Sequence, residues 1–89
     1  MKIEYDPDFL KLVKKVDVRI RKYLKQKLEI FLKNPHELQL NNHQLRDKYE
    51  GYRSIDITSD WRAVYEEFEQ SGEIVAYFVD LGTHKELYG

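Results

Sequence analysis

The residues of this sequence that could carry out chemistry are histidines and charged side chains in and just before its second half. His43 precedes a run of predicted strands, Asp56 lies on the polar face of one of them, and His84 follows the last. Asp60 and Arg62 flank the turn between two strands. An imidazole titrates near neutral pH and can take or give a proton, while a guanidinium offers paired donors that match phosphate oxygens. Strand pairing could bring these side chains together.

Such a set is suited to RNA cleavage by attack of the ribose 2′-hydroxyl on the neighbouring phosphate. The hydroxyl needs a base, the leaving 5′-oxygen needs an acid, and the phosphorane between them needs positive charge. We expect His84 to transfer protons and Arg62 to hold the phosphate. Asp56 or Asp60 would orient a histidine or accept a proton, and Tyr88 could stack on an unpaired base.

Each of these residues also has a structural interpretation. His84 could be a surface loop residue, and Asp60 an ordinary turn residue. Arg62 could pair with a neighbouring carboxylate on the sheet. Trp61 and Tyr65 are expected to pack in the core or on the sheet rather than to hold a base.

Metal and cofactor sites are not indicated. The chain has no cysteine, no His-Glu-x-x-His helix and no glycine-rich phosphate loop. The spacing of His43, Asp56, Asp60 and His84 is not typical of metal ligands. We therefore expect neither a bound metal nor a cofactor.

The N-terminal part of the chain predicts a strand followed by two helices. Residues 2–5 alternate polar and apolar side chains. Asp6 is a suitable N-cap, since Pro7 at the first helical position has no amide to lose. Asp17 can cap a second helix, which runs to about Lys33 and is stopped by Asn34-Pro35.

The rest of the chain predicts an antiparallel meander. Strands are expected over residues 52–58, 61–68 and 73–81, with Gly82 ending the last and a short C-terminal segment after it. The 89 residues, of which 42% are hydrophobic, form one domain, 1–89. The fold class is α+β, with an N-terminal strand and a helical hairpin before the meander.

Charge is distributed unevenly along the chain. Residues 1–48 carry a net charge of +5 and residues 49–89 a net charge of −6, which leaves −1 overall. The basic half could meet nucleic acid or an acidic partner, or could be only a solvated face. The lack of cysteine, of a signal segment and of a long apolar run predicts a cytoplasmic protein that does not bind membranes.

Two segments carry a resemblance to a known family. Residues 51–65, GYRSIDITSDWRAVY, and residues 82–89, GTHKELYG, resemble the RelE/ParE superfamily of type II toxins, most closely its YafQ branch. The resemblance implies that superfamily's fold over the whole chain. It also implies an mRNA interferase, a metal-independent endoribonuclease that cuts mRNA in the ribosomal A site. A cognate antitoxin would inhibit it within a hetero-oligomeric complex.

The resemblance to the YafQ branch assigns roles to individual residues of this chain. His43 matches the histidine before the sheet, Asp60-Trp61 the branch's Asp-Trp pair, and His84 the catalytic C-terminal histidine. Tyr88 matches an aromatic residue that positions substrate. Arg62 falls on the arginine that RelE and YoeB proteins use for phosphate.

Two features depart from the branch. Asp56 stands where the branch has a histidine, and the chain is neutral where ribosome-dependent toxins are strongly basic.

Arg53 and Lys85 are further predicted to bind substrate. The alternatives are a ParE-like gyrase inhibitor, a catalytically inactive module that only binds an antitoxin, or a small domain without toxicity.

Overall fold

Two aspartates begin the N-terminal helices, as the sequence predicts. The computed structural model describes residues 1–89, and its first elements are β1 (Lys2–Tyr5), α1 (Pro7–Lys15) and α2 (Val18–Lys33). Asp6 Oδ1 accepts a hydrogen bond of 2.8 Å from the Asp8 amide, and Asp17 Oδ1 accepts one of 2.7 Å from the Arg19 amide. Each carboxylate therefore satisfies an amide that the first helical turn leaves without a partner. No helix has both the length and the apolar character needed to cross a bilayer.

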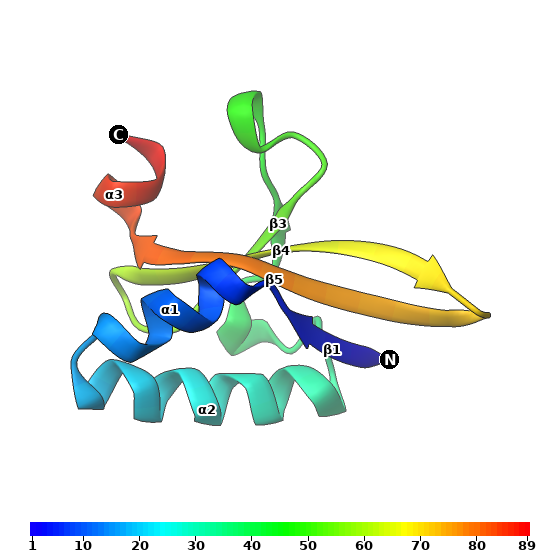
Figure 1. Ribbon diagram of the computed structural model, residues 1–89, viewed down its shortest axis with the longest axis horizontal. Coiled ribbons are helices and arrows are strands. Elements are labelled where there is room, and N and C mark those ends of the chain that lie inside the picture. Colours follow the sequence, from blue (N-terminus) through cyan, green and yellow to red (C-terminus); the bar gives the residue numbers. More distant parts are fainter.

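The remaining elements build one five-stranded sheet and the structures that stand on it. They are η1 (Leu38–Leu40), β2 (His43–Gln44), η2 (Asp47–Tyr49), β3 (Arg53–Asp56), β4 (Trp61–Gln70), β5 (Glu73–Thr83) and α3 (His84–Tyr88), where η denotes a 3-10 helix. The strand order is β1-β5-β4-β3-β2, and only the β1–β5 pair is parallel. This confirms the predicted α+β fold with its helical hairpin and meander. Figure 1 shows α1 and α2 on one side of the sheet, while α3 and the β2–β3 loop (residues 45–52) rise on the other.

The structure corrects three details of the predicted strands. His43 and Gln44, which were expected only to precede the strands, form a short edge strand, because they pair with Ser54 and Arg53. Strand β3 ends at Asp56 rather than at residue 58, since the amides at 57 and 58 turn back to the Trp61 carbonyl. The prediction that Gly82 ends β5 was wrong. The strand continues to Thr83, and Gly82 is needed for space, because an added Cβ would lie 3.3 Å from Leu87 of α3.

The core between the helices and the sheet is aromatic. Phe31 of α2 makes edge-on contacts with Tyr65 of β4 and Phe78 of β5, with ring centroids 5.1 and 5.5 Å apart. Phe9 of α1 lies 5.7 Å from Phe78. Tyr65 is fully buried, and Trp61 packs partly buried against this cluster. Their predicted packing role is confirmed.

The register of the strands decides which side chains face away from the helices. Neighbours across a sheet share a face. His43 pairs with Ser54, and two residues along β3 Asp56 pairs with Arg62. Arg62 in turn pairs with Gly82, which lies beneath α3. His43, Asp56 and Arg62 therefore share the face on which α3 stands.

Candidate active site

A cleft of about 400 Å³ on this face brings together four of the predicted site residues. It includes side chains from β2, from the β2–β3 loop, from β4 and from α3. The lining residues are Asn41, His43, Gln44, Leu45, Arg46, Arg62, His84 and Tyr88. The predicted residues among them are His43, Arg62, His84 and Tyr88, which come from three separate parts of the chain.

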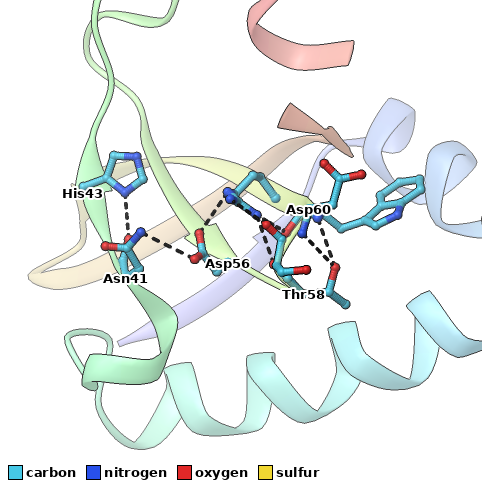
Figure 2. Close-up of polar contacts among 8 residues, drawn as sticks. Asn41, His43, Asp56, Thr58 and Asp60 are labelled. Atoms are coloured by element: carbon cyan, nitrogen blue, oxygen red, sulfur yellow. Dashed lines mark hydrogen bonds and ion pairs between the residues drawn. The ribbon is translucent and has the colours of Figure 1, made fainter. Parts of the chain in front are cut away.

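A backbone contact fixes the proton on His43. Its Nδ1 lies 2.7 Å from the carbonyl oxygen of Asn41. Because a carbonyl oxygen can only accept, Nδ1 must carry the hydrogen. In the neutral ring this leaves Nε2 with a free lone pair. His43 is thus oriented as a proton acceptor at the edge of the sheet (Figure 2).

Arg62 is held by the turn that precedes it. Its Nε lies 3.0 Å from Asp56 Oδ1, and the two side chains are only 15% and 24% exposed. Its Nη1 donates to the carbonyls of Thr58 and Trp61, and its Nη2 donates to that of Ser59. The three hydrogen bonds use both N–H groups of Nη1 and one of Nη2, while Nε faces Asp56 in an ion pair, so one N–H on Nη2 stays available. Arg62 pairs with the neighbouring carboxylate, as its structural interpretation predicts.

Asp56 lies between two partners and has no contact with a histidine. One carboxylate oxygen faces Arg62, and the other accepts a hydrogen bond of 3.4 Å from Asn41 Nδ2. Asn41 in turn presents its carbonyl to His43. Figure 2 shows the contacts from His43 to Asn41 and from Asn41 to Asp56. Asp56 therefore acts on His43 only through Asn41.

His84 is placed by the start of α3. Thr83 is the N-cap: its hydroxyl accepts from the Glu86 amide at 3.2 Å, while Glu86 Oε1 accepts from the Thr83 amide at 2.8 Å. This reciprocal capping box fixes the first turn of the helix. The His84 amide donates to the Asp60 carbonyl at 3.0 Å, so the β3–β4 turn also supports it. The imidazole is exposed and lines the cleft.

Four predicted residues are not among the side chains that line the cleft: Asp56, described above, and Asp60, Lys85 and Arg53. Asp60 contributes its backbone to His84, but its own carboxylate is exposed and forms no ion pair. Lys85 is exposed on α3. Arg53 lies on the opposite face of β3 from Asp56, where its Nε donates to Asn42 Oδ1 at 2.9 Å. It lines a separate cleft of about 790 Å³ beside the first.

Tyr49 and Asp80 were not predicted as site residues. The Tyr49 hydroxyl donates a hydrogen bond of 3.0 Å to Asp80 Oδ2 and so ties the β2–β3 loop to β5. Arg46, on the same loop, was also missed and lines the cleft. The one available signal was Asp80, a charged residue within an otherwise apolar predicted strand, because a half-buried carboxylate needs a partner.

Tyr49 should lose its proton only at high pH. Burial, and after it the hydrogen bond to Asp80, raise the pKa of Tyr49 to about 12. The fold therefore favours the neutral phenol. This contribution to stability is present below the ordinary tyrosine pKa of about 10 and is lost as the pH rises through about 12. Absorbance titration of the wild type minus Tyr49→Phe should give a phenolate midpoint near 12, whereas a midpoint near 10 would contradict the contact.

No group of three or more histidine, aspartate or glutamate side chains is gathered in a way that could hold a metal ion. The polar side chains of the cleft are two imidazoles, two guanidinium groups, a phenol and the amides of Asn41 and Gln44. These groups can move protons and hold anions, so the arrangement suits acid–base cleavage of a phosphodiester.

Comparisons with known proteins identify the family of the chain. Residues 1–89 match the family described as bacterial toxin of type II toxin-antitoxin system, YafQ. No functionally curated protein matches the chain. YafQ from E. coli strain BL21(DE3) is 27% identical with a TM-score of 0.79, and the match covers 99% of this chain and 98% of that one.

Two further solved structures are similar. The E. coli DinJ-YafQ complex contains a chain that is 29% identical, with a TM-score of 0.65 and coverage of 99% and 98%. The YoeB/ParE toxin from Agrobacterium tumefaciens is 18% identical, with a TM-score of 0.74 and coverage of 94% and 99%, and supports the fold alone. Since the family match spans the whole chain, the protein belongs to the YafQ family of toxins of bacterial type II toxin–antitoxin systems.

Proposed function

We propose that this toxin is a ribosome-dependent mRNA endoribonuclease that cuts in the A site and is inhibited by a cognate antitoxin. The observation that carries the proposal is the convergence of His43, Arg62, His84 and Tyr88 on one cleft. An inhibitor that acts by surface contact has no need for two imidazoles and a guanidinium around one cavity. The proposed target of the toxin, the translating ribosome, is cytoplasmic, so we expect the toxin to act in the cytoplasm.

The two histidines divide the proton transfers. His43 Nε2, whose lone pair is free, takes the proton of the ribose 2′-hydroxyl as the oxygen attacks phosphorus. The bond from phosphorus to the 5′-oxygen breaks, and the protonated imidazole of His84 gives its proton to that oxygen. The products are a 2′,3′-cyclic phosphate and a 5′-hydroxyl. Exchange of one proton with solvent at each ring restores the starting state.

Positive charge near the phosphate comes from two arginines. The free Nη2 N–H of Arg62 can contact a phosphate oxygen, although the ion pair with Asp56 neutralises part of its charge. Arg46 lines the same cleft, is exposed and has no ion pair. We therefore assign phosphate binding to Arg62 and Arg46 together.

The remaining predicted residues take supporting roles. Asp56 orients His43 through Asn41, and Asp60 supports His84 through its backbone carbonyl. Tyr88 presents an aromatic ring on the wall of the cleft, where a base can stack, and Lys85 can meet the RNA backbone at the rim. RNA could reach Arg53 only through the neighbouring cleft.

Support for an antitoxin partner comes from a relative. The E. coli YafQ chain, similar over nearly the full length, is described in complex with DinJ. A toxin that shares this fold is expected to form a hetero-oligomer with an antitoxin of its own.

Purified toxin added to programmed ribosomes, to naked mRNA and to a gyrase supercoiling assay tests this function. We expect cuts at A-site codons on ribosomes, none in naked mRNA and unchanged supercoiling. Inhibited supercoiling without cuts would show a gyrase inhibitor instead. Activity in none of the three assays would indicate a module that only binds an antitoxin, and cuts in naked mRNA would remove the ribosome from the proposal.

A further inference from the structure

A row of aromatic rings joins the two walls of the cleft. It consists of Tyr52, Tyr49, Tyr88 and His84, and we call it the aromatic row. Tyr49 lies 6.4 Å from Tyr52 and 5.8 Å from Tyr88, and the Tyr88 ring lies 5.0 Å from the imidazole of His84. Each contact is edge-on, a favoured arrangement for aromatic pairs. The β2–β3 loop therefore reaches His84 through Tyr88.

Tyr49 is the member of the aromatic row that is hydrogen-bonded to the sheet. Its hydroxyl donates to Asp80 Oδ2 at 3.0 Å, and Asp80 Oδ1 accepts from the Leu81 amide at 2.9 Å. Asp80 belongs to β5, which has a paired strand on each side in the sheet. Lys48 Nζ also lies 5.3 Å from the centre of the Tyr49 ring. The ring is thus anchored to the sheet although it sits on a loop.

Helix α3 depends on such contacts because it is short. It has five residues, of which only Leu87 is fully buried. The capping box fixes its first turn, but it does not set the direction of the His84 side chain. The Tyr88 hydroxyl is buried without a hydrogen-bond partner, so Tyr88 contributes to this helix through its ring. Its two ring neighbours are Tyr49 and His84.

We propose that Tyr49 is a positioning residue, whose ring, anchored by Asp80, holds Tyr88 and thereby the imidazole of His84 in the cleft. Tyr49 is not among the side chains that line the cleft, and so it acts through Tyr88. The effect on cleavage rests on the proposed function, whereas the effect on the orientation of His84 does not.

The test compares Tyr49→Leu, which removes the ring, with Tyr49→Phe, which keeps it. Tyr23→Leu is the matched control, because Tyr23 is 46% exposed on α2 and belongs to no aromatic pair. We expect Tyr49→Leu to lower the kcat of ribosome-dependent cleavage by about 10- to 100-fold, with KM close to that of the wild type. Tyr49→Phe keeps the ring but loses the hydroxyl that bonds Asp80, so its kcat should lie between those of Tyr49→Leu and the wild type. Circular dichroism corrects each rate for the folded fraction.

A second measurement separates this proposal from the proposed function. In Tyr49→Leu the NMR resonances of the His84 ring should move further than in Tyr23→Leu, because the neighbouring Tyr88 ring shifts. If neither the wild type nor any variant cleaves RNA, the proposed function fails. The His84 resonances then test the positioning role of Tyr49 by themselves. Unmoved His84 resonances in folded Tyr49→Leu would overturn the positioning role. So would moved resonances with an unchanged kcat.

Discussion

Replacement of His84 by alanine is expected to slow ribosome-dependent mRNA cleavage by about 10²–10⁴-fold, the usual contribution of a general acid or base. His84 lines the cleft opposite the β2–β3 loop, and the proposed reaction gives it the proton for the leaving 5′-oxygen. Without that proton the 5′-oxygen must leave as an alkoxide or take a proton from water. The rate is measured as fragment yield against time on programmed ribosomes.

This loss should come without a loss of stability. The His84 side chain is exposed, and the contacts that place its backbone are kept in alanine. Surface substitutions of this kind usually stay within about 0.5 kcal/mol. His36→Ala is the matched control, because His36 is also exposed but does not line the cleft. Full cleavage by folded His84→Ala would remove His84 from the chemistry.

Replacement of Phe31 by alanine is expected to cost about 3–5 kcal/mol of the free energy of unfolding. Phe31 is fully buried, and its ring packs edge-on against Tyr65 and Phe78. It thereby joins α2 to the two central strands. Because domains are stable by only about 5–15 kcal/mol, much of the variant should be unfolded at 37 °C. Urea unfolding followed by circular dichroism measures the change.

Leu38 provides the comparison for this variant. It is also a large apolar residue, but it is 92% exposed in η1. Leu38→Ala should change the free energy of unfolding by no more than about 0.5 kcal/mol. Equal effects of Phe31→Ala and Leu38→Ala would contradict the described core.

The elements of the fold were predictable because their signals are local. Asp6-Pro7 and Asp17 act on amides within one helical turn, so each start could be located from a few residues. The meander followed from alternation in β3 and from apolar runs in β4 and β5. The extension of β5 beyond Gly82 was missed, because the need for glycine comes from Leu87 packing above it, and this contact exists only after α3 has folded.

The site was less predictable, because it depends on register and packing. The alternation of β3 separates Arg53 from Asp56, so the strand pattern itself contained the reason why Arg53 lies outside the cleft. The two-residue strand β2 has no periodicity from which its pairing could be deduced. Tyr49 was missed because its importance depends on two partners, Asp80 and Tyr88, that lie more than thirty residues further along the chain.

The chemistry of the cut ends tests the central claim most directly. RNA fragments from programmed ribosomes treated with the wild-type toxin can be examined for a 2′,3′-cyclic phosphate and a 5′-hydroxyl, with His84→Ala as the comparison. The cleft predicts both end groups for the wild type and almost no fragments for His84→Ala. Fragments with a 3′-hydroxyl and a 5′-phosphate would show that water, not the 2′-hydroxyl, attacks, and would contradict the proposed roles of His43 and His84.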